Sequence, residues 1–95
     1  MLSWLKAGNS VVITGGANGI GLAAAEYYLG VGMKVLIADI NQEALAEAEQ
    51  TLQIGDGELT VQICDVSNFD QVKQLRDTAL ESFGRVDCLM NNAGA

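Results

Sequence analysis

Closely spaced glycines follow an apolar run near the amino terminus of the chain. The segment reads Thr14-Gly15-Gly16-Ala17-Asn18-Gly19-Ile20-Gly21. Glycine lets the main chain approach a ligand closely and adopt backbone angles that other residues resist. The helix expected after this segment begins with unpaired amides and a partial positive charge, which suits a pyrophosphate group. The pattern therefore predicts an anion-binding loop over residues 14–21.

Other glycine-rich motifs fit the same segment less well. Residues 16–21 match the first six positions of a P-loop, but Leu22 and Ala23 stand where the phosphate-binding lysine and the Ser/Thr are required. The dinucleotide fingerprint G-x-G-x-x-G/A fits from Gly19 onward, although its first glycine normally follows the strand directly. Here four residues separate Gly19 from Thr14. A tight strand-to-helix turn that binds no ligand is the remaining alternative.

Two acidic residues end later apolar runs. Asp39 lies 18 residues beyond Gly21, where a carboxylate can accept hydrogen bonds from the hydroxyls of an adenosine ribose. The same charge would repel a 2′-phosphate, so it favours NAD over NADP as the cofactor. Asp65 ends the third run in the equivalent way, where it would either bond the adenine amino group or begin the turn before Ser67. Asp39 could instead be a solvated charge at the end of a strand or at the start of a helix.

The elements that must position these residues alternate along the chain. Apolar runs predict strands, helical spacing of apolar residues predicts helices, and glycines or polar clusters separate them. The strands are expected at residues 9–14, 34–39, 59–64 and 86–90, and the helices at residues 19–31, 41–53 and from about 67 to 84. The order β-α-β-α-β-α-β predicts an α/β fold, a Rossmann-like doubly wound parallel sheet with strand order 3-2-1-4.

Local signals give finer expectations for these elements. Asn41 is expected to cap the second helix, and Ser67 with Asp70 to form a capping box on the third. In the predicted strand order, Cys64 and Cys88 lie on strands roughly 14 Å apart, so they cannot be bridged and are expected to be small buried residues. The apolar residues of the first helix at helical spacing are Ile20, Ala23, Ala24, Tyr27, Tyr28 and Val31.

Composition limits the classes of partner and compartment. A chain of 95 residues that is 49% hydrophobic and 18% charged is typical of one small folded domain. The net charge of −7, with only five basic residues, argues against nucleic acid or an anionic membrane as partner, because phosphates are held mainly by Lys and Arg. Polar residues and glycines interrupt the uncharged stretch 7–25, so it is not expected to span a membrane. With no targeting segment visible, the cytoplasm is the expected compartment, and no metal site is assigned.

Taken together, these residues resemble the short-chain dehydrogenase/reductase family. Its cofactor loop, Thr-Gly-x-x-x-Gly-x-Gly, is matched in full by Thr14, Gly15, Gly19 and Gly21. The resemblance implies that Asp39 is the acidic residue of NAD-preferring members, that Asp65-Val66 contacts adenine, and that Asn91-Asn92-Ala93-Gly94 braces the sheet and lines the adenine-ribose side of the cleft. The implied cofactor-binding residues are Thr14, Gly15, Asn18, Gly19, Ile20, Gly21, Asp39, Asp65, Val66, Asn91, Asn92, Ala93 and Gly94.

The family's catalytic residues are a Ser and a Tyr-x-x-x-Lys that follow the Asn-Asn-Ala-Gly motif. Tyr27 and Tyr28 cannot replace them, because Val31 and Gly32 stand where the lysine is needed. We therefore interpret residues 1–95 as the NAD(P)-binding Rossmann portion of one incomplete domain, with no catalytic residue of its own. The resemblance implies an oxidoreductase that transfers hydride between nicotinamide and an alcohol/carbonyl substrate. A longer chain would bind that substrate, and the intact protein is compatible with a homo-oligomer.

Truncation after the fourth strand would turn an otherwise central strand into an unprotected apolar edge. We predict that the segment alone is aggregation-prone or loosely packed.

Two other functions are kept as alternatives. One is a non-catalytic NAD-binding module. The other is an S-adenosylmethionine methyltransferase, which also places glycines after its first strand and acids after its second and third; the long loop and the Asn-Asn-Ala-Gly motif weigh against it.

Overall fold

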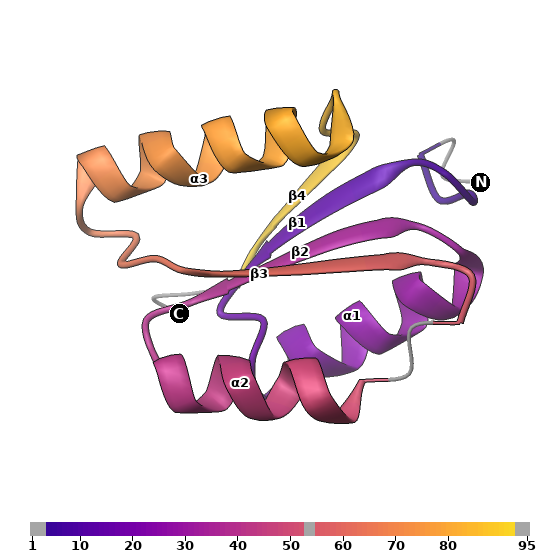
Figure 1. Cartoon of the computed structure of the whole chain (residues 1–95), viewed down its shortest axis with the longest axis horizontal. Coiled ribbons are helices and arrows are strands. Elements are labelled where there is room, and N and C mark those ends of the chain that lie inside the picture. The colour runs from indigo at the N-terminus through magenta and orange to yellow at the C-terminus, as the bar shows by residue number, and fades with distance from the viewer. Residues whose placement is uncertain (1–3, 53–54, 93–95) are drawn as a thin grey trace.

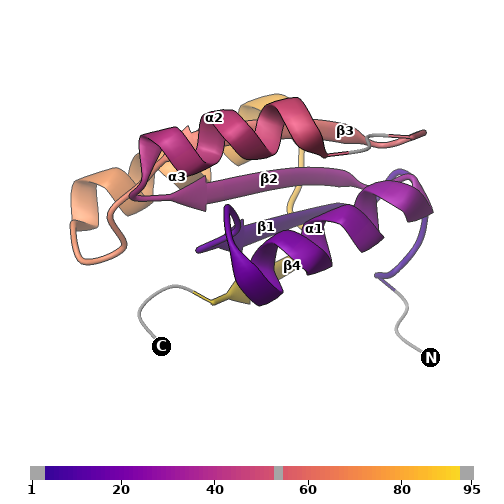
Figure 2. The ribbon, with the colours of Figure 1, turned by 90° about the horizontal axis from the view of Figure 1, so that it is seen from below.

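The computed structural model describes residues 4–52 and 55–92, which form a parallel sheet with helices on both faces. Strands and helices alternate in the predicted order. The elements are β1 (Ser10–Thr14), α1 (Gly19–Val31), β2 (Lys34–Asp39), α2 (Gln42–Thr51), β3 (Glu58–Ile63), α3 (Phe69–Phe83) and β4 (Cys88–Asn91). In Figures 1 and 2, α1 and α2 cover one face of the sheet and α3 lies on the opposite face.

The strand order is β3-β2-β1-β4, and all neighbouring pairs are parallel, as the sequence predicts. Val12 stands at the centre of the sheet, paired with Leu36 of β2 and Leu89 of β4. Parallel pairing brings the carboxyl ends of all four strands to one edge. The residues that follow β1, β2 and β3, together with the last residue of β4, therefore meet at that edge.

Alternating residues of the two central strands build a separate core on each face. Val11 and Ile13 of β1 face the layer of α1 and α2, where Leu29 is fully buried. Val12 and Leu36 face α3 and pack with a cluster that includes Cys64, Leu75, Ala79 and Phe83. Burial on both faces explains why β1 and β2 are continuous apolar runs rather than alternating ones.

The apolar face expected for α1 is confirmed only in part, because Ala24, Tyr28 and Val31 are partly buried against the core but other expected residues are not. The buried residues are Gly21, Ala25 and Leu29, four apart, whereas Ile20 is 73% exposed and Tyr27 is 58% exposed. This helix is apolar almost all round, so its periodicity does not single out a face. Small residues decide the contact, because they let the helix lie close to the sheet.

One of the two predicted caps is confirmed and the other is wrong. Asn41 accepts a hydrogen bond from the backbone N–H of Ala44 (3.0 Å) and caps α2. The cap of α3 is Asn68, not Ser67, and its side-chain oxygen accepts from the N–H of Gln71 (3.1 Å). Ser67 is instead committed to Asp65. A capping box with Asp70 therefore does not form.

The edge strands also differ in detail from the expectation. β4 runs from Cys88 to Asn91 rather than over 86–90, and β3 begins at Glu58. Cys64 and Cys88 are free thiols on opposite edges of the described sheet. Cys64 is buried as expected, but Cys88 is only half-buried because β4 has a single neighbouring strand.

Candidate dinucleotide-binding site

The glycine loop leaves β1 and crosses the carboxyl end of β2. Gly15 has a φ of 66° and Gly19 a φ of 57°, in the left-handed region that favours glycine. The N–H of Gly16 donates to the carbonyl oxygen of Ala38 (3.1 Å). A Cβ added to Gly16 would lie 2.8 Å from the Cβ of Ile37, so this position needs glycine for packing. Sequence reasoning did not single out Gly16, because the loop motif leaves that position variable.

The amino end of α1 differs from those of the other helices in the described chain. Asn18 occupies the cap position with extended backbone (φ −142°, ψ 161°) and makes no side-chain cap hydrogen bond, and the first turn holds no acidic residue. The starts of α2 and α3 each have an asparagine cap and an acidic side chain, Glu43 or Asp70. The positive end of α1 is therefore left without a side-chain counterpart, which suits an anionic ligand.

The space in front of this helix start is open. A Cβ on Gly19 would meet no heavy atom within 4 Å, and Asn18, Gly19 and Ile20 are exposed. Gly21, by contrast, faces inward: a Cβ there would lie 2.4 Å from the carbonyl oxygen of Gly15. Gly19 thus leaves room for a ligand, and Gly21 allows the helix to approach the loop.

Asp39 is half-buried at the end of β2 and lies beside this loop. One carboxylate oxygen, Oδ2, accepts from the N–H of Ala17 (3.3 Å), and the other, Oδ1, accepts from the N–H of Asn41 (3.0 Å). The carboxylate predicted to bind a ribose therefore already contacts the loop predicted to bind the pyrophosphate.

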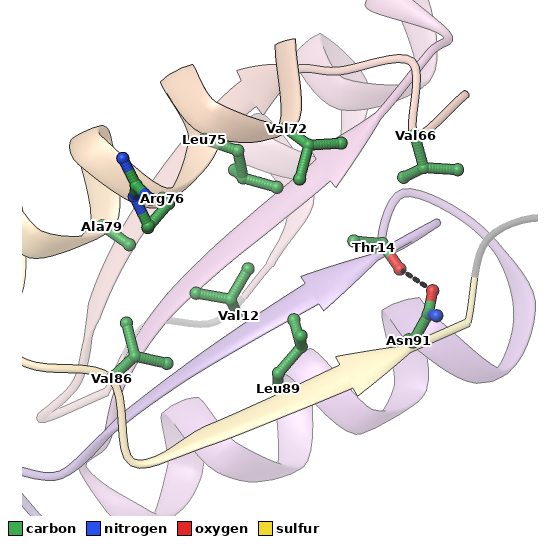
Figure 3. A pocket seen from close by; sticks show the side chains of 10 residues that line it. All are labelled: Val12, Thr14, Val66, Val72, Leu75, Arg76, Ala79, Val86, Leu89 and Asn91. Carbon is green, nitrogen blue, oxygen red and sulfur yellow. Dashed lines mark hydrogen bonds between the residues drawn. The ribbon is translucent and has the colours of Figure 1, made fainter. Parts of the chain in front are cut away.

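The end of β4 is tied to the end of β1 through Thr14. Its hydroxyl donates to the side-chain oxygen of Asn91 (3.0 Å, drawn in Figure 3) and accepts from the N–H of Asn92 (3.1 Å). The side-chain amide of Asn92 also donates to the carbonyl oxygen of Gly15 (3.2 Å). These contacts brace the strand ends behind the loop. Ala93 and Gly94, the other two predicted residues of this motif, lie outside the described residues.

Asp65 and Val66 follow β3 at the same edge. The N–H of Cys64 donates to the carbonyl oxygen of Asp39 (3.0 Å), so this segment runs beside the end of β2. The Asp65 carboxylate accepts from the hydroxyl (2.7 Å) and the N–H (2.9 Å) of Ser67, and these bonds lower its pKa. These are the contacts of a residue that begins a turn, which was one of the two sequence interpretations. Val66 is 38% exposed.

Ser10 and Asp87 tie β1 to β4 at the amino ends of the two strands. Ser10 is buried, and its N–H donates to the carboxylate of Asp87 (2.9 Å). The N–H of Asp87 in turn donates to the Ser10 hydroxyl (3.2 Å), and Arg85 forms an ion pair with the same carboxylate. The hydrogen bond from Ser10 and the guanidinium of Arg85 lower the pKa of Asp87 below its ordinary value of 3.8.

An open cavity of about 340 Å³ lies between α3 and β4. Figure 3 shows mainly apolar side chains around it, from Val12, Val72, Leu75, Val86 and Leu89, with Thr14, Asn91 and Val66 at one end. It lies on the α3 face of the sheet, away from the open side of Gly19. Arg76 also lines this cavity, and Thr14, Val66 and Asn91 are among the predicted cofactor-binding residues, but residues 15–21 of the glycine loop do not line it. We therefore do not identify it as the site of the pyrophosphate.

The tyrosines of α1 take no part in the site. The ring of Tyr28 packs edge-on against Trp4, with ring centroids 5.7 Å apart, and its pKa is raised by burial and by the Cys88 thiol. Within residues 4–52 and 55–92, no three His, Cys, Asp or Glu side chains are grouped so that they could hold a metal ion. Nor does any helix in this part of the chain have the length and apolar character needed to cross a membrane.

A glycine loop, an uncapped helix and a strand-end aspartate at the carboxyl edge of a parallel sheet define a Rossmann-like α/β protein. The chain belongs to the short-chain dehydrogenase family, whose sequence profile, described as "short chain dehydrogenase", matches residues 9–95.

Relatives and solved structures agree with this assignment. The chain is 46% identical over 88 residues to 3beta-hydroxysteroid dehydrogenase 2 of Eggerthella lenta, covering 93% of this chain and 34% of that protein. It is 46% identical over 87 residues to tropinone reductase-like 2 of Erythroxylum coca, covering 92% and 30%. A short chain dehydrogenase/reductase from Burkholderia phymatum in complex with NAD superposes with a TM-score of 0.84 at 40% identity, covering 93% and 31%. The chain thus spans about a third of the length of these relatives.

Proposed function

We propose that residues 1–95 bind the dinucleotide of an NAD(P)-dependent oxidoreductase and that they prefer NAD to NADP. One observation supports this most directly. The open, uncapped start of α1 lies next to a carboxylate at the end of β2, with Ala17 of the loop bonded to Asp39. An anion-binding site beside a hydrogen-bond acceptor matches the pyrophosphate and adjoining ribose of a dinucleotide.

The contacts of the loop, of Asp39 and of the two asparagines support a role for each. The backbone amides at Gly19, Ile20 and Gly21 would hold the pyrophosphate, since basic side chains are scarce in this chain. Asp39 would accept from the ribose hydroxyls and repel a 2′-phosphate. Asn91 and Asn92 would keep the end of β4 in place behind the loop.

The chemistry proposed for the intact protein is hydride transfer between nicotinamide and an alcohol/carbonyl pair, which the bound cofactor would supply. No residue here is assigned a catalytic role. Substrate contacts and catalytic residues would come from a longer chain, for which we propose a cytoplasmic location and which is compatible with a homo-oligomer. The adenine contact of Asp65-Val66 is likewise a proposal, because the Asp65 carboxylate is engaged by Ser67.

Calorimetric titration with NADH, NADPH and S-adenosylmethionine tests this proposal. We expect measurable binding of NADH, weaker binding of NADPH, and none of S-adenosylmethionine. Asp39→Ser should narrow the difference between NADH and NADPH, because it removes the charge that repels the 2′-phosphate. Asp77→Ser is the matched control, since Asp77 is an exposed acid on α3 whose partner is Arg76. Tighter binding of S-adenosylmethionine than of NADH would contradict the proposed function.

A further inference from the structure

Two hydrogen bonds from backbone amides hold the middle of the glycine loop on β2 rather than on β1, the strand from which it emerges. The N–H of Gly16 donates to the carbonyl oxygen of Ala38, and the N–H of Ala17 donates to Oδ2 of Asp39. Ala17 is only 4% exposed. The second of these bonds is made by a side chain, so a substitution can remove it without changing the backbone of β2.

The same carboxylate reaches a second element. Oδ1 of Asp39 accepts from the N–H of Asn41, and Asn41 in turn caps α2 through Ala44. One side chain therefore joins the loop to the start of α2. A carboxylate offers about four lone-pair sites, so both oxygens could still accept from a ligand while these backbone bonds are kept.

We propose that Asp39 is a positioning residue for the glycine loop in addition to its expected contact with the ribose. It fixes Ala17 before any ligand arrives, and it thereby couples recognition of the ribose to recognition of the diphosphate. Removing the carboxylate therefore weakens the binding even of a ligand that carries no ribose hydroxyls. The loop-positioning claim concerns the ligand-free chain, whereas the coupling rests on the proposed function.

Hydrogen exchange at the Ala17 amide of the ligand-free chain tests the positioning claim. We expect protection in the wild-type chain and roughly tenfold faster exchange in Asp39→Ser, whose short side chain cannot replace the carboxylate, a factor that corresponds to about 1.4 kcal/mol. Asp65→Asn is the matched control, because the Asp65 carboxylate bonds Ser67 and not the loop, so Ala17 exchange should not change. The amide of Leu29, a buried residue in the last turn of α1, reports whether each variant keeps its fold.

An unprotected Ala17 amide in the wild-type chain would overturn the proposal. So would equal Ala17 exchange in the wild-type chain and in an Asp39→Ser chain that keeps protection at Leu29. Both outcomes are read without any ligand, and they do not depend on the proposed function.

A cycle of ligands and variants tests the coupling. ADP and its 2′,3′-dideoxy analogue are titrated into the wild-type chain and into Asp39→Ser. If the aspartate only bound hydroxyls, the variant would bind the dideoxy analogue no more weakly than the wild type does. Removal of a negative charge would by itself strengthen the binding of this anionic ligand. Weaker binding therefore points to the loop.

We expect the dideoxy analogue to bind several-fold more weakly to Asp39→Ser than to the wild-type chain. Unchanged or tighter binding of the analogue would overturn the coupling. Failure of ADP to bind the wild-type chain would contradict the proposed function instead, and the Ala17 exchange would still decide whether Asp39 positions the loop.

Discussion

Replacing Gly21 by alanine should disrupt the junction between the loop and α1. The added Cβ would lie 2.4 Å from the carbonyl oxygen of Gly15 and 3.0 Å from the side-chain nitrogen of Asn92. Ordinary van der Waals contact begins at 3.4 Å, so the helix start would have to move by about 1 Å from a carbonyl that has no side-chain freedom. Overpacking of this kind typically costs about 1–3 kcal/mol.

A cost of about 2 kcal/mol corresponds to a fall in melting temperature of roughly 8–16 °C for a domain of this size. We expect this fall in Gly21→Ala, measured by thermal and urea unfolding at low protein concentration. Affinity for NADH should fall as well, because the displaced amides are those proposed to hold the pyrophosphate.

Gly30→Ala is the control for Gly21→Ala. Gly30 also lies in α1, but a Cβ there would meet nothing within 4 Å, so alanine should stabilise the helix by up to about 1 kcal/mol. An unchanged urea midpoint in Gly21→Ala, or equal effects of the two substitutions, would refute the close-approach argument.

Three further predictions follow from the described contacts. Asp87 has a lowered pKa in the folded chain, so its stabilising contribution is present above its ordinary value of 3.8 and is lost as the pH falls below it. Asp87→Asn should therefore lower the melting temperature at pH 7. It should also reduce the further fall in melting temperature when the pH is lowered. Leu89 is 63% exposed on the edge strand, so Leu89→Lys should reduce self-association in sedimentation velocity. Asn92→Asp turns a donor toward the Gly15 carbonyl into an acceptor, which should cost about 1–3 kcal/mol in urea unfolding.

Each of these three variants has a control on the outer surface of α3. Asp77→Asn removes an exposed acid and should leave the pH dependence of the melting temperature unchanged. Leu80→Lys changes another exposed leucine, away from the edge strand, and should not alter self-association. Gln74→Glu repeats the change from amide to acid at an exposed position of α3, outside the candidate site. Equal effects in a variant and its control would contradict the corresponding prediction.

The fold was predictable where one strong signal dominated. The buried runs of β1 and β2 have no polar residue at their centres, and the glycine after each helix marks a chain reversal; both signals are local. The buried face of α1 was not predictable in the same way, because apolar residues surround that helix. Its buried residues are Gly21, Ala25 and Leu29, and Gly21 lies directly against the glycine loop.

Some features of the candidate site follow from local sequence patterns, and others do not. Thr14, Gly15, Gly19, Gly21 and Asp39 could be selected because each follows a strand at a spacing that the chemistry requires. The bond from Ala17 to Asp39 joins residues 22 positions apart, and no local pattern reveals it. The cap of α3 was misassigned because Ser67 and Asn68 are both good capping residues. Competition from Asp65 for Ser67 decides between them.

The paired contacts at the two ends of β4 bear on its register. This strand has four residues and a single neighbour in the described sheet, so its backbone ladder alone resists sliding only weakly. A shift by one residue would exchange the faces of Leu89 and Met90 and turn every side chain of the strand over. The bonds of Ser10 to Asp87 and of Thr14 to Asn91 would both break in that shift. Ser10 and Thr14 of β1 therefore help to fix the register of β4, an edge strand with few backbone hydrogen bonds of its own.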